Sequence, residues 1–260
     1  MDDTESNKMK PPLEGEVDVG QYRVTLLPHI GSGSFGQVYK AVHRHTKELV
    51  AVKGIKCVFE GEFIKDSQDM ALAEAESMKR INHPNILSLL DFQMYKGTAW
   101  LFMEYCEKGD LEKYLQANVN ISLAKKYDIM LQSASAVLHM HHHKPPIIHR
   151  DIKPANILMK KGPTGDVAML TDFGFAKLYD LNLSQCGSVV YRNFHESVKG
   201  TPCYMAPEFY LEEESGVKYT ATVDVFSLGL MFAVMLDFGP ENRSMQPLSG
   251  MFEFLYNVTH

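Results

Sequence analysis

The hydrophobic pattern changes partway along this chain, and that change constrains the fold more than any other feature. From Tyr22 to about Ile55, short runs rich in Val, Ile and Tyr are broken by glycines, which is typical of antiparallel strands. Residues 66–81 have helical spacing, Met94–Glu104 has the composition of a strand, and helical patterns dominate from Asp110 onward. A small strand-rich part followed by a larger helical part predicts an α+β fold.

The remaining segments suggest how the domain is bounded. Residues 1–20 are rich in charge, so we expect a flexible leader before a single domain over residues 21–260. Loops are predicted at residues 144–156 and 172–208. The apolar run Val225–Leu236 is too short to span a bilayer and predicts a core helix that is buried on every side.

Composition excludes several classes of partner. The 26 Lys and Arg residues are outnumbered by 32 Asp and Glu residues, giving a formal net charge of −6 and no basic footprint for nucleic acid. The four cysteines are widely spaced, which favours neither a disulfide framework nor a zinc site. We expect no membrane partner and a cytoplasmic location, with a nuclear location left open.

A glycine-rich hexapeptide lies in the strand-rich part and consists of Gly31, Ser32, Gly33, Ser34, Phe35 and Gly36. A dinucleotide site would need a helix directly after the glycines, whereas Gln37–Val42 has a strand pattern. Backbone amides in a glycine hairpin can approach a phosphate because no side chain obstructs them. Taken alone, the segment fits a phosphate-binding loop and an ordinary tight hairpin equally well.

A lysine follows this loop at the end of the next strand pattern. In Val50–Lys53, the side chains of Ala51 and Lys53 share one face. A small Ala beside a Lys leaves room for a flat base while the ammonium group reaches phosphates. The spacing from the glycines resembles a known family pattern in which a glycine loop is followed by a strand lysine, and this resemblance favours a nucleotide-binding lysine over an ordinary surface one.

Two glutamates on the predicted helix could hold this lysine. Helical geometry places Glu74 on one stripe with the apolar residues Ala71, Met78 and Ile81, whereas Glu76 projects to a different face. The apolar neighbours indicate that the stripe faces inward. We therefore predict that Glu74 pairs with Lys53 and that Glu76 is solvated.

The most specific signal is a run of polar residues in the helical part. His149-Arg150-Asp151-Ile152-Lys153-Pro154-Ala155-Asn156 is followed by Asp172-Phe173-Gly174. Phosphoryl transfer needs one carboxylate to orient the attacking hydroxyl and further oxygen atoms to hold Mg²⁺. Asp151 suits the first role, and Asn156 and Asp172 suit the second. Any one of them could be a cap or turn residue, but their order and spacing together indicate a catalytic set.

These motifs resemble those of the eukaryotic protein kinase family. The resemblance runs from about Tyr22 to Leu236 and includes Ala206-Pro207-Glu208 and Asp224–Gly229. It implies a bilobal fold with a β-rich N-lobe over about residues 21–104 and a helical C-lobe over about residues 107–260. It also implies that ATP and Mg²⁺ are the cofactors and that Asp151, Lys153, Lys53 and Glu74 are catalytic.

The resemblance further implies an adenine site and a regulatory spine. Ile30 and Val38 would flank the adenine, with Ala51 above it and Leu158 below. Met103 would be the gatekeeper, and the backbones of Glu104 and Cys106 would bond the adenine edge. The spine would consist of Met78, His149 and Phe173, and Asp224 would brace the catalytic loop.

Two features resemble the serine/threonine subgroup. Lys153 stands two residues after the catalytic Asp151, and Gly200-Thr201-Pro202 precedes Ala206-Pro207-Glu208. They imply protein substrates that are phosphorylated on Ser or Thr hydroxyls.

A weakly active or inactive kinase-fold scaffold is the alternative. Little sequence follows the Val225–Leu236 helix, and we find no arginine that would pair with Glu208. We would then expect another chain or a chaperone to cover an incomplete C-lobe. The presence of Lys53, Asp151 and Asp172 favours the enzyme.

A histidine cluster stands before the catalytic run and comprises His139, His141, His142 and His143. It resembles a metal-binding tract. The kinase resemblance places it at the end of the helix before the catalytic loop, where positive charge interacts favourably with the helix dipole. We favour the second interpretation.

Ser197 lies three residues before Gly200, where the resemblance places an activating phosphorylation site for an upstream kinase. A phosphate there would carry nearly two negative charges and pair with Arg150 and Lys177, ordering the loop. We expect the Ser197→Ala variant to have lost most of the kinase activity of the unmodified chain, once that chain has been shown to carry phosphate at Ser197. Equal rates of phosphate transfer by the two proteins would contradict this expectation.

Overall fold

The structure, a computed structural model, describes residues 13–33, 36–59, 62–178, 202–208 and 220–245. The chain forms two units, one made of Met1–Ala71 and Leu89–Tyr105 and the other of Leu72–Ser88 and Cys106–His260. The first is built on a β-sheet, and the second combines helices with short strands. The α+β class predicted from the sequence is confirmed.

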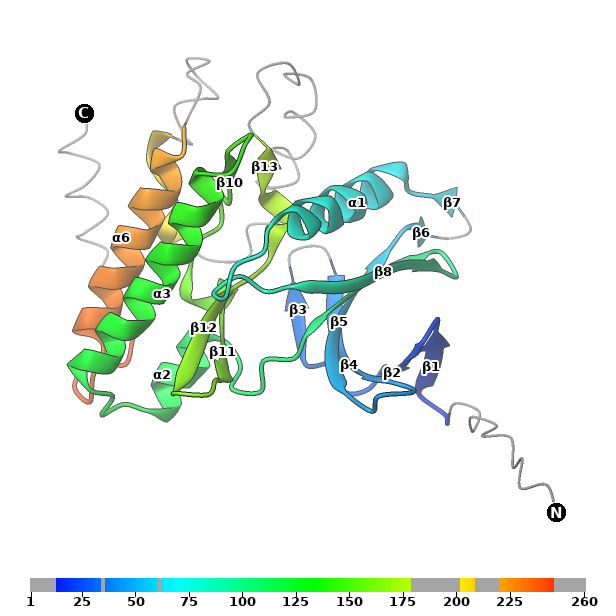
Figure 1. Ribbon diagram of the computed structural model, residues 1–260, viewed down its shortest axis with the longest axis horizontal. Helices are drawn as coiled ribbons and strands as arrows, with labels where there is room; N and C mark the ends of the chain where they lie inside the picture. Colours follow the sequence, from blue (N-terminus) through cyan, green and yellow to red (C-terminus); the bar gives the residue numbers. More distant parts are fainter. Residues whose placement is uncertain (1–12, 34–35, 60–61, 179–201, 209–219, 246–260) are drawn as a thin grey trace. The chain divides into compact units, whose positions relative to one another are not determined.

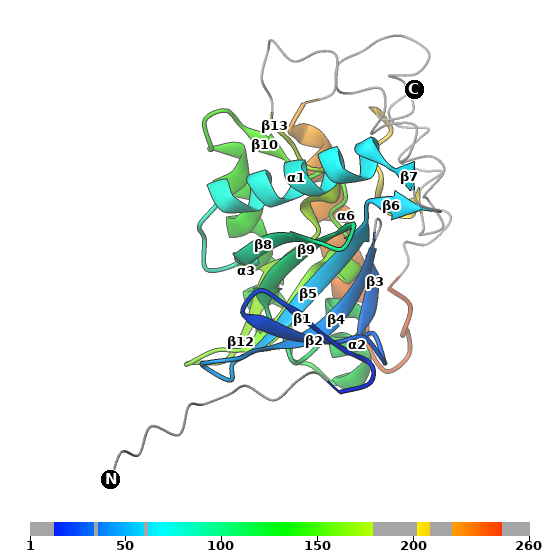
Figure 2. The ribbon, with the colours of Figure 1, turned by 90° about the vertical axis from the view of Figure 1, so that its right-hand side faces the viewer.

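One antiparallel sheet organises the first unit (Figure 2). Its strands follow the order β1-β2-β4-β5-β9-β8, and β3 pairs with β4. Their bounds are Glu16–Val19 for β1, Tyr22–Thr25 for β2, Gly31–Gly33 for β3, Gly36–His43 for β4, Leu49–Lys56 for β5, Leu89–Tyr95 for β8 and Thr98–Glu104 for β9.

Large side chains on one face of this sheet form its core. Val24, Val52 and Phe102 are fully buried, and the Tyr22 ring stacks on Phe102 with 3.9 Å between ring centroids. Burying such rings and branched chains stabilises the sheet in proportion to the apolar area removed from water.

The single strand predicted over Met94–Glu104 is wrong. That segment contains the end of β8 and all of β9, which are joined by a tight turn. Lys96 and Gly97 both have positive φ, at 49° and 71°. Such a pair makes the two-residue turn that matches the twist of a hairpin.

The helix predicted over residues 66–81 is confirmed as α1, which spans Lys65–Arg80. It follows a small hairpin of β6 (Val58–Phe59) and β7 (Glu62–Phe63). The boundary between the two units falls within this helix, after Ala71.

Besides the part of α1 that follows Ala71, the second unit contains three helices and a hairpin in its described residues (Figure 1). The helices are α2 (Leu111–Ala117), α3 (Leu123–His141) and α6 (Thr222–Asp237), and the hairpin pairs β11 (Ile157–Lys161) with β12 (Asp166–Leu170). Shorter elements are β10 (Ile147–Ile148), β13 (Lys177–Leu178) and the 3₁₀ turns η1 (Pro154–Asn156), η2 (Phe173–Phe175) and η3 (Pro202–Tyr204).

Helices α2 and α3 begin at side chains that cap them. Asp110 accepts a hydrogen bond from the Lys113 amide at 2.8 Å, and Ser122 accepts one from the Lys125 amide at 3.2 Å. Each satisfies an amide that has no partner inside the helix.

Helix α6 lies beside α3 (Figure 1), and a buried cation of α3 closes its C-terminal end. Lys126 Nζ donates to the carbonyl oxygens of Leu236 at 3.3 Å and Phe238 at 2.5 Å. The last carbonyls of a helix lack intrahelical donors, and a cation there also interacts favourably with the helix dipole.

The predicted complete burial of α6 is wrong, because Val225 is 57% exposed, Leu236 is 44% exposed and Gly229 is also exposed. The opposite face, which includes Val223 and Met231, is buried. Among the residues that the structure describes, no helix is long and apolar enough to cross a membrane.

The role of Lys126 can be tested by substitution. Lys126→Met keeps the aliphatic length but leaves the carbonyls of Leu236 and Phe238 without their donor, so the free energy of unfolding should fall by about 2 kcal/mol. Urea unfolding measures this change. Lys65→Met is the matched control, because Lys65 is an exposed lysine at the first position of α1, and it should change stability by less than about 0.5 kcal/mol. Equal effects of the two substitutions would contradict the capping role.

Candidate active site

A buried carboxylate forms hydrogen bonds with the backbone at the start of the catalytic run His149–Asn156. Asp224, in the first turn of α6, has no exposed surface and accepts hydrogen bonds from the amides of His149 and Arg150, each at 2.8 Å. His141 Nε2, from the last turn of α3, lies 2.8 Å from the same carboxylate. The predicted brace between Asp224 and the catalytic loop is therefore present, with His141 as an additional member.

Asp151 follows directly and is held on one oxygen. Its Oδ2 lies 2.9 Å from Lys153 Nζ and accepts a hydrogen bond from Asn156 Nδ2 at 2.8 Å. Burial raises the pKa of the Asp151 carboxyl; Lys153 opposes this rise and Asp172 adds to it. The carboxylate is thus a better proton acceptor than an ordinary aspartate.

Asn156 reaches back to the same residue a second time. Its Nδ2 also donates to the Asp151 carbonyl oxygen at 2.7 Å, and its side chain is buried. With the amide nitrogen used twice, the amide oxygen Oδ1 is the atom that this side chain can offer to a cation.

Asp172 has a left-handed backbone conformation, with φ 64° and ψ 72°, which is costly for a residue with a Cβ. The chain on both sides of it is fixed. His149 Nε2 contacts the Thr171 carbonyl oxygen at 3.0 Å, and the buried Phe173 ring meets the His149 ring edge-to-face at 5.2 Å between centroids. Met78, the third residue of the predicted spine, is 2% exposed.

In the first unit, the predicted nucleotide residues lie on three neighbouring strands. Val38 of β4 is opposite Lys53 of β5, and Ala51 of β5 is opposite Met103 of β9. Lys53, at 3% exposure, is buried far more deeply than an ordinary lysine. Ile30 precedes β3 and donates its amide to the Val38 carbonyl oxygen at 2.8 Å.

The glycine-rich segment forms a hairpin in which Gly33 is opposite Gly36, while Ser34 and Phe35 lie outside the described residues. A Cβ on Gly36 would collide with the Gly54 carbonyl oxygen of β5, so close packing of two strands alone requires this glycine. Gly31 and Ser32 occupy the first two positions of β3.

The predicted orientation of α1 is confirmed. Ala71, Glu74, Met78 and Ile81 are all buried, with Glu74 only 2% exposed, whereas Glu76 is exposed. Glu74 is therefore the buried carboxylate of this helix, and its pairing with Lys53 stays a prediction.

The remaining residues predicted to contact adenine are Glu104 in the first unit and Cys106 and Leu158 in the second. Glu104 ends β9, and the buried Cys106 begins the next stretch of the second unit. In that unit, Lys108 and Gly109 exchange backbone hydrogen bonds with Met159, and Leu158 of β11 is bridged to Asp110.

Three further predictions concern the activation segment, Glu208 and a metal-binding cluster. Ser197 and the triplet Gly200-Thr201-Pro202, apart from its proline, fall outside the described residues. Glu208 Oε2 is buried, and in the described part of the chain it has no hydrogen-bond partner. No group of three or more His, Cys, Asp or Glu side chains suited to a metal ion occurs among the described residues.

Sequence reasoning did not identify the role of His141. The histidine cluster drew attention to the end of α3, but only the fold brings one of its members to Asp224. The short stretch of sequence between the histidine cluster and the catalytic loop was the signal that could have indicated the role of His141.

Comparison with protein families gives one match that covers most of the chain. Residues 24–246 match the family described as the protein kinase domain. The match spans the glycine-rich hairpin, the catalytic run and α6.

Individual relatives are named as serine/threonine-protein kinases. The chain is 37% identical to a probable LRR receptor-like serine/threonine-protein kinase of Arabidopsis thaliana, 32% to serine/threonine-protein kinase ULK1 of Homo sapiens and 34% to serine/threonine-protein kinase ULK3 of Xenopus laevis. These alignments cover 90%, 85% and 79% of this chain but only 22%, 20% and 40% of the relatives. The chain thus spans a fifth to two fifths of their length.

The hydrogen bonds of Asp224 predict that replacing this carboxylate by an amide strongly lowers the stability of the fold. Asp224→Asn turns one acceptor oxygen into a donor that faces the amide of either His149 or Arg150, so the free energy of unfolding should fall by about 3 kcal/mol. Chemical denaturation measures this effect. The control is Asp237→Asn, an exposed carboxylate at the other end of α6, which should be nearly neutral. A loss no larger than the control's would show that the carboxylate is dispensable.

Proposed function

Because this chain belongs to the protein kinase domain family, we propose that it is an active serine/threonine kinase that transfers the γ-phosphoryl group of ATP to Ser and Thr hydroxyls of proteins. The observation that carries the proposal is the arrangement around Asp151, whose Oδ2 is held by both Lys153 and Asn156. The names of the relatives support the serine/threonine class.

The arrangement gives Asp151 a defined role. With Oδ2 fixed by two donors, Oδ1 is the atom that accepts the hydrogen of the substrate hydroxyl, and the carboxylate orients that hydroxyl for attack. Burial, which raises the pKa of Asp151, lets it take up the proton as the new bond to phosphorus forms. Lys153, 2.9 Å from the same carboxylate, places a positive charge where negative charge develops on the transferred group.

The side chains present fit Mg²⁺. Asn156 has Oδ1 to offer because its nitrogen is engaged by Asp151, and Asp172 supplies a carboxylate; both are the hard oxygen ligands that Mg²⁺ prefers. When bound, Mg²⁺ neutralises charge on the phosphates. Two protein ligands suffice because phosphate oxygens and water complete the shell of this ion.

Lys53 and Ala51 support the choice of ATP as the phosphate donor. Both lie on β5, whose neighbours β4 and β9 carry Val38 and Met103 opposite them. A buried ammonium group can hold phosphate oxygens, and the small Ala51 side chain leaves space for a flat base.

The alternative, a kinase-fold scaffold without catalysis, is not favoured. Such modules usually lack the strand lysine, the catalytic aspartate or the metal-binding aspartate. Lys53, Asp151 and Asp172 are all present, and the hydrogen bonds around Asp151 are formed.

Two substitutions test the function. Lys53→Met removes the charge that aligns the phosphates, and Asp151→Asn removes the proton acceptor, so each should lower the rate of phosphate transfer at least about 100-fold. Transfer of labelled phosphate to a generic basic protein measures the rate, and circular dichroism checks that each variant is folded.

Lys56→Met is the matched control for the lysine, because Lys56 is exposed at the end of the same strand. It should retain the rate of the unmodified chain. Undiminished transfer by folded Lys53→Met or Asp151→Asn would overturn these assignments. The absence of any Mg-ATP-dependent transfer by the folded, phosphorylated unmodified chain would overturn the proposed function itself.

A further inference from the structure

The strand that leads to Asp172 has one edge bonded mainly by side chains. β12 pairs with β11 along one side, in the register Ile157↔Leu170 to Lys161↔Asp166. In an antiparallel pair, every second residue turns its backbone groups away from the partner strand. For β12 these are residues 166, 168 and 170, whose groups need partners from elsewhere.

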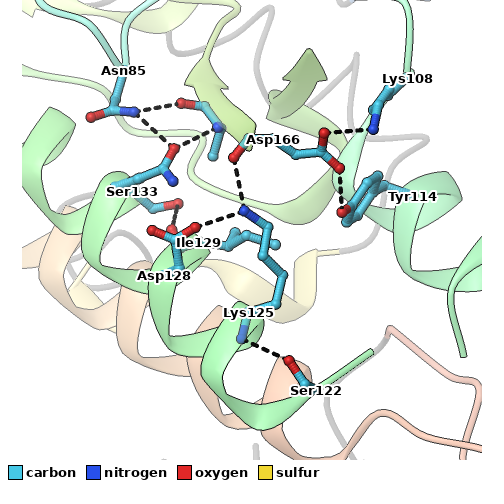
Figure 3. Close-up of polar contacts among 11 residues, drawn as sticks. Asn85, Lys108, Tyr114, Ser122, Lys125, Asp128, Ile129, Ser133 and Asp166 are labelled. Atoms are coloured by element: carbon cyan, nitrogen blue, oxygen red, sulfur yellow. Dashed lines mark hydrogen bonds and ion pairs between the residues drawn. The ribbon is translucent and has the colours of Figure 1, made fainter. Parts of the chain in front are cut away.

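Helix α3 and the segment before β8 supply those partners (Figure 3). The Asp166 carbonyl oxygen accepts from Lys125 Nζ at 2.9 Å. The Ala168 amide donates to Gln132 Oε1 at 2.7 Å, and the Ala168 carbonyl oxygen accepts from Asn85 Nδ2 at 3.0 Å.

The last residue of the strand is held by backbone alone. The Leu170 amide donates to the Asn85 carbonyl oxygen, and its carbonyl oxygen accepts from the Leu87 amide, each at 2.9 Å. Thus all three positions of this edge are bonded, and the edge ends two residues before Asp172.

Gln132 is the junction of these contacts. Its Oε1 accepts from the Ala168 amide and also from Asn85 Nδ2, at 3.0 Å. One turn earlier on α3, the Asp128 carboxylate lies 2.6 Å from Lys125 Nζ. One oxygen therefore serves two donors, and its loss would leave both without this acceptor.

The first residue of β12 is fixed independently of Gln132. The Asp166 carboxylate lies 2.5 Å from Lys108 Nζ and accepts from the Tyr114 hydroxyl at 2.7 Å. Burial and the bond to Asp166 raise the pKa of Tyr114 to about 12, so this phenol remains a donor at neutral pH. A change at Gln132 should therefore loosen the Asp172 end of the strand rather than its start.

We propose that Gln132, acting with Asn85, is a positioning residue for Asp172, holding the edge of β12 so that the Asp172 carboxylate stays in place to bind Mg²⁺. The left-handed backbone of Asp172 persists only while the chain on both sides is constrained. The buried Phe173 constrains the side that follows Asp172. On the preceding side, Thr171 is bonded to His149 and Asn156, and the Gln132 junction holds the strand that leads to it. The inference rests on the proposed kinase function, in which Asp172 is a metal ligand.

The test compares Gln132→Met with the full unmodified chain. The apparent Mg²⁺ concentration for half-maximal phosphate transfer should rise about 10-fold or more, the scale seen when groups that orient metal ligands are removed. The KM for the protein substrate should stay unchanged. Hydrogen–deuterium exchange should become faster in the peptide that covers residues 166–172.

Two further variants separate positioning from stability. Gln116→Met makes the same change at an exposed position of α2 and should alter neither the Mg²⁺ dependence nor the exchange. Gln132→Glu keeps an acceptor oxygen for Ala168 and Asn85 and should recover at least half of the lost Mg²⁺ affinity. All rates are measured well below the unfolding temperature of each variant.

A folded Gln132→Met with the Mg²⁺ dependence and exchange of the unmodified chain would overturn the proposal. So would a Gln132→Met that unfolds at a lower temperature but keeps that Mg²⁺ dependence, because the side chain would then be merely structural. If the unmodified chain transfers no phosphate, the kinase proposal fails. The positioning role is then decided by exchange in residues 166–172 and by the thermal shift that Mg²⁺ with ADP produces.

Discussion

The buried carboxylate of Asp224 is the contact on which the second unit's catalytic residues depend. Its two oxygens accept from the amides of His149 and Arg150 and also meet His141, so three elements converge on one side chain. An unpaired carboxylate without exposed surface would cost several kcal/mol, whereas a fully bonded one fixes the surrounding backbone. His149, once fixed, contacts Thr171 and Phe173, which extends the constraint to Asp172.

Polar side chains form hydrogen bonds with backbone groups that have no partner within a helix or sheet. Lys126 closes α6, Asn156 bonds the Asp151 carbonyl oxygen, and Gln132 occupies the edge of β12. Buried amides and carbonyls must find partners, and helices or sheets cannot supply them at their own ends. The side chains that meet this requirement are therefore the ones that place the catalytic groups.

Sequence was most informative where chemistry is set by local spacing. It separated Glu74 from Glu76 because helical periodicity decides which of them is buried. It missed the β11–β12 hairpin, since β11 ends in Lys160-Lys161 within a region rich in helical patterns. It also missed Gln132, because the partners of this residue are distant in sequence and nothing near it distinguishes it from a surface glutamine.

Two residues of the catalytic motifs have strained backbone conformations. Among the described residues, four that are not glycine have positive φ, and two of them, Arg150 and Asp172, belong to the catalytic motifs. Neither conformation is favoured locally, so no short-range sequence pattern predicts it. Each is held from outside: Arg150 through the bond from its amide to Asp224, and Asp172 through the fixed strand before it and the buried Phe173 after it. The same hydrogen bonds thus stabilise the fold and determine where the reacting groups point, so a substitution that weakens them should lower stability and activity together.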